Sequence, residues 1–140
     1  AAAVILMSEK KLKASGTKPL ARVVAYGHFA HDPKWFTTAP VTAIKRALDK
    51  AGLKAEDIDL YEINEAFANV TMAAMRDLKI PHNKVNVNGG AIALGHPIGG
   101  SGARVLTTLV HALHQHGKRY GLATLCIGGG EAVACIVERV

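Results

Sequence analysis

Segments with the apolar pattern of β-strands alternate with segments of helical periodicity along nearly the whole chain, and this alternation restricts the fold more than any other feature. The expected strands span residues 1–7, 20–26, 58–63, 85–87, 121–126 and 132–137, and the expected helices span 8–15, 40–51, 65–78 and a stretch around 105–113 that Gly117 terminates. Three strand–helix–strand units predict right-handed crossovers and a mainly parallel sheet with helices on its faces. Glycines at 128–130 join the last two strands in a hairpin that adds an antiparallel edge.

The length of 140 residues fits a single domain. The longest apolar run, residues 1–7, is far shorter than the roughly 20 residues of a membrane span. It also lacks the basic leader and the cleavage site of a signal peptide. Because the first residue is Ala1 rather than Met, we expect a chain that is cut from a longer polypeptide and has no membrane span.

The charge balance, 17 Lys and Arg against 11 Asp and Glu, gives a net charge of +6 and favours anionic partners. Aromatic residues make up only 5% and no basic, aromatic-rich segment is present, so we expect no nucleic-acid partner. An acidic small molecule or simple solubility explains the charge equally well. Two cysteines are too few for a disulfide scaffold, which indicates a reduced, intracellular setting.

Polar chemistry follows three of the expected strands: Asn64, then a glycine-rich stretch that leads to His96, then Cys126. Ligands collect beyond the carboxyl ends of the strands in sheets of this kind, so this convergence is the first indication of function. Asn64 opens the motif Asn-Glu-Ala-Phe-Ala. One interpretation is a helix N-cap, and the other is a fixed amide that orients a water or a substrate carbonyl; one residue can do both.

The stretch 86–104 contains six glycines, which are costly unless the backbone turns sharply or approaches a ligand closely. It has neither the dinucleotide spacing G-x-G-x-x-G nor the phosphate-loop pattern G-x-x-x-x-G-K-S/T, so a nucleotide site is unsupported. His96 lies within it between Gly95 and Pro97. A loop histidine is often solvated or structural. Because ordering this glycine-rich backbone costs free energy, a catalytic role is an equal alternative.

Cys126 precedes Ile127 and the glycines 128–130. It is either a small buried hydrophobe or a reactive thiol beside bare backbone N–H groups, which would suit an oxyanion site. Cys135 lies in the middle of an apolar strand, and a core position is the favoured interpretation there.

Two histidine groups are weighed as metal ligands. The first contains His28, His31 and Asp32, and the second is the helix end with His111, His114 and His116. Zinc needs a defined set of four ligands, which neither group supplies, so we expect no metal site.

Three motifs together resemble the C-terminal part of a thiolase, most closely the acetyl-CoA acetyltransferase branch. They are N-E-A-F-A at 64–68, G-G-A-I-A-L-G-H-P at 89–97 and C-I-G-G-G at 126–130, and the resemblance extends over essentially all residues in order. It implies a thiolase-like α/β fold with a five-stranded mixed sheet and helices on both faces. It also implies that residues 1–18, a strand and a short helix, end the family's first half and that residues 19–140 form the C-terminal domain.

Carried over to this sequence, the resemblance implies a covalent mechanism. The acyl-accepting cysteine and the loop domain that grips coenzyme A lie outside these residues in the family. His96 would deprotonate that cysteine and donate to the thioester oxygen, and Asn64 would hold a water that completes the same oxyanion hole. Cys126 would be the acid/base that removes an α proton from acetyl-CoA.

The resemblance further implies that the backbone N–H of Gly128 serves a second oxyanion hole and that Phe67 and Ala66 line the acyl pocket. The implied function is a reversible Claisen condensation that forms 3-ketoacyl-CoA, with acetoacetyl-CoA favoured. Coenzyme A thioesters are then substrates, and no cofactor is expected. The implied partners are the thiolase N-terminal half and further copies in a dimer or tetramer.

Three alternatives stay open. The first is a 3-ketoacyl-CoA thiolase of fatty-acid degradation. The second is a non-catalytic half that acts only in folding or association, and the third is a decarboxylating condensing enzyme, against which Cys126 argues. We expect the chain to be inactive alone because no residue matches the acyl-accepting cysteine. We expect a cytoplasmic location, with mitochondria or peroxisomes as the eukaryotic alternatives.

Overall fold

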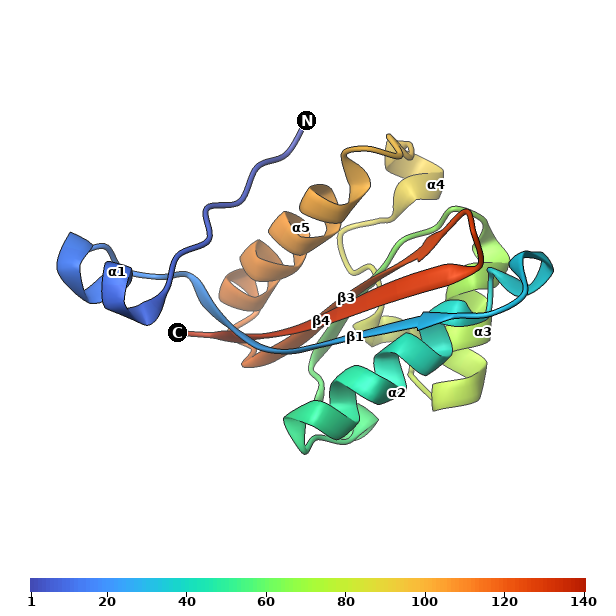
Figure 1. Ribbon diagram of the computed structural model, residues 1–140, viewed down its shortest axis with the longest axis horizontal. Coiled ribbons are helices and arrows are strands. Elements are labelled where there is room, and N and C mark those ends of the chain that lie inside the picture. Colours follow the sequence, from blue (N-terminus) through green and yellow to red (C-terminus); the bar gives the residue numbers. More distant parts are fainter.

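A computed structural model describes all residues from 1 to 140 and contains one mixed sheet of four strands. In sheet order these are β1 (Ala21–Ala30), β4 (Glu131–Arg139), β3 (Tyr120–Ile127) and β2 (Leu60–Ile63), as Figure 1 shows. Only β2 and β3 run parallel, whereas β1–β4 and β3–β4 are antiparallel. The expected mainly parallel sheet with the hairpin at its edge is therefore wrong. The hairpin lies in the middle because β1 pairs along the free side of β4, and this pairing runs from Ala21 to Ala30, beyond the expected end at Tyr26.

The expected fifth strand at 85–87 shrinks to a single bridge between Val85 and Tyr61. Asn86 explains why the pairing stops, because its backbone turns into the left-handed region with φ of 48°. Its side chain then takes over the pairing: Oδ1 accepts from the Ile63 N–H and Nδ2 donates to the Ile63 carbonyl, both at 2.9 Å. The mixed α/β class with helices on both faces is confirmed, with four strands instead of five.

Two helices cover one face of the sheet and one helix covers the other (Figure 1). α2 (Ala39–Ala51) and α3 (Ala68–Leu78) pack on an apolar cluster of 16 buried residues, and α5 (Ser101–Gln115) packs on a second cluster of 7. α2 turns one apolar face to its cluster, with Val41, Ile44 and Leu48 buried, and Gly52 closes the helix in the left-handed conformation. The remaining helical pieces are α4 (Ala91–Leu94) and the 3-10 turns Pro33–Trp35, Ala55–Asp57 and His82–Lys84.

Residues 1–18 lie away from the sheet, whereas the Leu20 carbonyl accepts from the Val140 N–H at 3.3 Å. The expected strand at 1–7 is absent, because this segment has no neighbouring strand to pair with in the chain (Figure 1). α1 (Glu9–Ser15) does form, as expected from the sequence, with the Ser8 hydroxyl accepting from Lys11 N–H at 3.2 Å and Gly16 closing it at φ of 65°. No residue of α1 is buried. None of the helices in the structure is long and apolar enough to span a membrane.

Deletion of residues 1–18 tests this separation. Since residues 1–20 contain no buried side chain, we expect the free energy of unfolding of the shortened chain to stay within about 0.5 kcal/mol of the original. We also expect a more monodisperse peak on a sizing column, because four exposed apolar side chains at 4–7 are removed. Greater aggregation or a clear loss of stability would show that the boundary near residue 18 is misplaced.

Candidate active site

The carboxyl ends of the two parallel strands meet at one edge of the sheet. Ile63 pairs with Thr124, and the next amide, that of Asn64, donates to the Thr124 carbonyl at 3.0 Å. Cys126 lies two residues further along β3, directly before Ile127, the last residue of the strand. The predicted convergence of Asn64 and Cys126 at one sheet edge is therefore present, as expected for strands that run side by side in the same direction.

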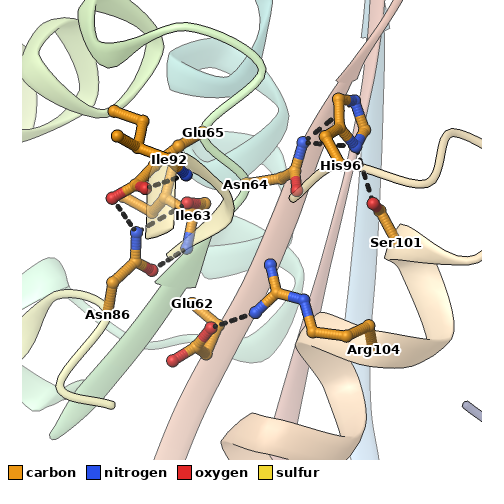
Figure 2. A network of polar contacts seen from close by, with 9 residues as sticks. All are labelled: Glu62, Ile63, Asn64, Glu65, Asn86, Ile92, His96, Ser101 and Arg104. Atoms are coloured by element: carbon orange, nitrogen blue, oxygen red, sulfur yellow. Dashed lines mark hydrogen bonds and ion pairs between the residues drawn. The ribbon is translucent and has the colours of Figure 1, made fainter. Parts of the chain in front are cut away.

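Asn64 and His96 contact each other although 32 residues separate them (Figure 2). Asn64 is fully buried, and its Nδ2 lies 3.3 Å from Nε2 and 3.5 Å from Nδ1 of the exposed His96 ring. His96 Nδ1 lies 2.6 Å from the hydroxyl of Ser101, which donates onward to the Pro97 carbonyl at 3.1 Å. Because the Ser101 hydroxyl donates its proton to the Pro97 carbonyl, it accepts from His96. This places the ring proton on Nδ1. Nε2 is then an unprotonated acceptor, which is the form that a general base needs.

Two glycines hold the loop that carries His96. Gly95 has φ of 89°, which favours glycine, and its N–H donates to Ala91 at 2.7 Å to end α4. A side chain at Gly90 would collide with the Glu65 carboxylate. Two of the six glycines in this stretch are thus explained by one turn and one close approach within the protein, beside the site.

A clamp made by Glu65 and Asn86 fixes this loop against the end of β2, and the sequence analysis did not single out either residue. Glu65 accepts from Asn86 Nδ2 at 2.9 Å through Oε1 and from the Ile92 N–H at 3.0 Å through Oε2 (Figure 2). The carboxylate therefore ties α4 to the strand end just beside Asn64. It also explains why α3 begins at Ala68 rather than at Glu65. An asparagine between valines in a short expected strand was the available signal.

Cys126 lies on the side of the sheet that α2 and α3 cover, half-buried against the larger apolar cluster. Burial raises the pKa of its thiol, and a hydrogen bond from its own backbone partly offsets this. The structure does not bring the thiol into hydrogen-bond contact with Asn64 or His96, which lie by the first turn of α5. Cys135 is half-buried too and packs against the α5 cluster, as the core interpretation favours.

The remaining predicted site residues surround the same edge. Gly128 is exposed at the tip of the β3–β4 hairpin, with nothing within 4 Å of where a side chain would start. Phe67 is 61% exposed and meets Phe36 edge-on at 6.0 Å between ring centres, while Ala66 is half-buried against the core. The Phe67 ring and the Gly128 backbone are therefore open to a ligand or to another protein surface.

One histidine of each group makes a hydrogen bond within the fold. His31 Nε2 pairs with the Trp35 carbonyl at 2.7 Å, and His114 Nε2 pairs with the Leu20 carbonyl at 2.8 Å. No group of three or more His, Cys, Asp or Glu side chains is arranged to hold a metal ion.

A buried carboxyl lies beneath the site and was also missed by the sequence analysis. Glu62 is 1% exposed, and its Oε2 accepts from Arg104 Nη1 at 3.3 Å. Burial raises the pKa of Glu62 to about 7; Arg104 opposes this shift and the Glu65 charge adds to it. Desolvation therefore outweighs the ion pair, as is common for buried carboxylates.

The raised pKa of Glu62 predicts a pH-dependent stability. A folded-state pKa of about 7 lies above the ordinary value of 4.5, so this contribution is fully present below about pH 4.5 and is lost as the pH rises through 7. Relative to Glu62→Gln, which mimics the protonated form, we expect the wild-type free energy of unfolding to fall by about 1–3 kcal/mol between about pH 5 and about pH 8. Urea unfolding of both proteins at each pH measures this difference. Identical pH dependence in the two proteins would contradict it.

Comparison with known proteins gives one consistent result. Residues 17–139 match the family model described as "Thiolase, C-terminal domain". The acetyl-CoA acetyltransferase of Escherichia coli is 51% identical over all of this chain, and the cytosolic acetyl-CoA acetyltransferase of Mus musculus is 50% identical over 99% of it. The chain covers 36% and 35% of these two relatives, about a third of their length.

Solved structures agree with the sequence comparison. The acetyl-CoA acetyltransferase of Bacillus anthracis matches with a TM-score of 0.93 and 46% identity over 96% of this chain and 34% of its own. Human mitochondrial 3-ketoacyl-CoA thiolase in complex with CoA matches with a TM-score of 0.92 and 48% identity over 95% of this chain and 34% of its own.

Proposed function

The chain belongs to the thiolase family, and on that premise we propose that it supplies the C-terminal catalytic residues of an acetyl-CoA acetyltransferase. The reaction is the reversible condensation of two acetyl-CoA molecules to acetoacetyl-CoA and free CoA. A cysteine thiolate outside residues 1–140 attacks the first thioester carbonyl and releases CoA as a thiol. An enolate of the second acetyl-CoA then attacks the acyl-enzyme and releases the cysteine. The observation that carries the proposal is the Asn64–His96 pair beside the end of the Cys126 strand.

His96 and Asn64 serve the acylation step in this proposal. The free Nε2 of His96 accepts the proton of the attacking thiol, and the resulting N–H then donates to the thioester oxygen as it gains charge. The Asn64 amide holds a water that donates to the same oxygen. The 3.3 Å contact between Asn64 and His96 supports these two roles, because a hydrogen bond of this length is weak and a substrate can displace it.

Cys126 serves the condensation step. Its thiolate removes the α proton of acetyl-CoA, and the N–H of Gly128 donates to the enolate oxygen that forms. The raised pKa of Cys126 means a smaller thiolate fraction but a more basic thiolate, which suits the removal of a weakly acidic C–H proton. Phe67 and Ala66 line the acyl pocket beside it. Coenzyme A thioesters act as substrates, and the proposal needs no cofactor or metal.

In this proposal, another protein segment packs over the site and supplies the nucleophilic cysteine. Ile92 is 68% exposed, Leu94 59% and Ile98 87%, so the His96 loop presents three large apolar side chains outward. Exposed apolar groups gathered beside a site are typical of an interface. We assign their partner to the thiolase N-terminal half, and the assembly to a dimer or tetramer in the cytosol, the compartment in the mouse relative's name.

A 3-ketoacyl-CoA thiolase for longer chains is the second candidate, because the human enzyme of that name matches with 48% identity. Both candidates use the same residues and differ only in the acyl chain that is accepted. Rates with acetoacetyl-CoA and with a longer 3-ketoacyl-CoA separate them. A half that acts only in folding or association would show neither activity.

A chimera tests the proposed function. It joins the part of the E. coli relative that precedes the aligned region to residues 1–140 of this chain, which are 51% identical to the segment replaced. We expect the rate at which this chimera cleaves acetoacetyl-CoA with CoA to be within about tenfold of the rate of the intact relative. The reason is that the two parts together contain all the catalytic residues of the proposed mechanism. We expect the 140-residue chain alone to show no thiolysis, because it lacks the nucleophile of a covalent mechanism.

Circular dichroism and size-exclusion chromatography control for folding of the chimera. A folded, correctly sized chimera without thiolysis of any 3-ketoacyl-CoA would overturn the proposed function. Robust thiolysis by the purified chain alone would overturn the assignment of the nucleophile to another segment.

A further inference from the structure

Three polar atoms near the candidate site are buried without a hydrogen-bond partner: Glu62 Oε1, Asn64 Oδ1 and Arg104 Nε. A buried polar atom without a partner costs about 1–3 kcal/mol, so three of them together require an explanation. Figure 2 shows the guanidinium of Arg104 between the Glu62 carboxylate and the Asn64 amide. All three residues belong to one polar layer between β2 and α5.

The local structure brings these residues together. Glu62 and Asn64 are two positions apart at the end of β2, so both face the α5 side of the sheet. Ser101 and Arg104 are three positions apart on the first turn of α5, so both face the strand end. One helical turn therefore contacts His96 through Ser101 and Glu62 through Arg104.

The charge of Arg104 distinguishes the two possible orientations of the Asn64 amide. In the structure the amide oxygen turns toward the guanidinium and the nitrogen toward the His96 ring (Figure 2). The reverse orientation would set the Asn64 NH2 group against a cation that has only donors, and it would turn the oxygen toward the unprotonated Nε2. No hydrogen bond joins Asn64 Oδ1 to the guanidinium, so the preference is electrostatic: the reverse orientation would turn like partial charges toward each other at both ends of the amide. Glu62 in turn holds the cation, since its Oε2 accepts from Nη1.

From this geometry we propose that Arg104, anchored by Glu62, is a positioning residue that fixes the Asn64 amide with its nitrogen toward His96. The inference rests on the proposed function and deepens it. A correctly turned amide presents a donor where Asn64 binds its water and His96, and this donor adds to the preference for a proton on Nδ1 that Ser101 already gives His96. Glu62 holds Arg104, Arg104 orients Asn64, and Asn64 faces His96. Together they set which atoms of the oxyanion site donate and which accept.

Kinetics of the chimera with Arg104→Met test the proposal. We expect kcat for acetoacetyl-CoA thiolysis to fall about ten- to hundredfold, because a misplaced group near the reacting atoms costs that much, while KM stays within twofold. Combined with Glu62→Gln, which leaves no unpaired buried charge, the Arg104→Met chimera should fold and retain the deficit. Arg119→Met is the matched control, since it breaks another Arg–Glu pair, that with Glu138, and should leave kcat unchanged.

A double-mutant cycle separates positioning from a general structural effect. In an Asn64→Ala chimera, adding Arg104→Met should lower kcat less than twofold further, because the residue through which Arg104 acts is gone. A fully additive loss, or no loss of kcat in Arg104→Met itself, would overturn the proposal. An inactive wild-type chimera would instead refute the proposed function.

Nitrogen NMR of the 140-residue chain tests the proposal without any activity. Long-range ¹H–¹⁵N spectra report which ring nitrogen of His96 carries the proton. We expect the Nδ1–H tautomer in the wild-type chain and a shift toward a mixture in the Glu62→Gln, Arg104→Met double variant. An unchanged tautomer in that folded variant would contradict the role of Arg104.

Discussion

Replacing Cys126 by serine in the chimera should lower the rate of α-proton exchange of acetyl-CoA by about 10²–10⁴-fold, the usual contribution of a general base. The reason is that a serine hydroxyl ionises far less readily than a thiol of similar size, so the base is lost while the shape is kept. The measurement is deuterium incorporation at the acetyl methyl in D2O. Formation of the acyl-enzyme, followed as a burst of released CoA, should change much less because His96 activates the nucleophile.

Cys135→Ser is the matched control for this experiment. Both thiols are half-buried, and burial raises the pKa of each, but Cys135 packs against the α5 cluster on the other side of the sheet. Either serine buries a hydroxyl and should lower the free energy of unfolding by about 1–3 kcal/mol. Only Cys126→Ser should abolish exchange. If Cys126→Ser exchanged the α proton of acetyl-CoA at the wild-type rate, Cys126 would have only a packing role.

Replacing His96 by alanine should produce the opposite pattern. We expect the acylation burst to slow by about 10²–10⁴-fold at neutral pH, because the general base and one donor of the oxyanion site are both removed. The deficit should shrink as the pH rises through about 8.5, the ordinary pKa of cysteine, since the nucleophile then ionises without help. Rapid-quench measurement of CoA release across this pH range gives the profile.

His116→Ala controls for the removal of a histidine, because His116 is exposed just beyond the last turn of α5. It should acylate at the wild-type rate at every pH. A His96→Ala protein with a wild-type burst at neutral pH would contradict the role of His96 as the base.

Local patterns in the sequence were enough to locate α1, α2, α3 and α5, but not the short α4. α1 and α2 each begin within one residue of the predicted start and end where predicted, since periodicity and helix-ending signals depend on near neighbours. The meeting of Asn64 and His96 followed from one rule about strand ends.

Features that depend on partners far along the chain were not predictable in the same way. Periodicity cannot reveal which strand pairs with which, so the central position of the β3–β4 hairpin was missed. Asn86 reads as part of a strand although its side chain replaces the backbone in pairing with Ile63. The Glu62–Arg104 pair joins residues 42 positions apart, and an isolated glutamate or arginine carries no signal of such a contact.

The position of the acyl group in the working enzyme tests the central claim most directly. The claim is that residues 1–140 supply His96, Asn64 and Cys126 to a thiolase reaction whose nucleophile lies outside them. The chimera is incubated with acetyl-CoA, quenched in acid, digested and mapped by mass spectrometry for an acetyl thioester. We predict one acetylated cysteine in the segment taken from the E. coli relative, with Cys126 and Cys135 unmodified. Acetyl transferred to Cys126 would contradict the account, because that thiol would then be the nucleophile and not the base.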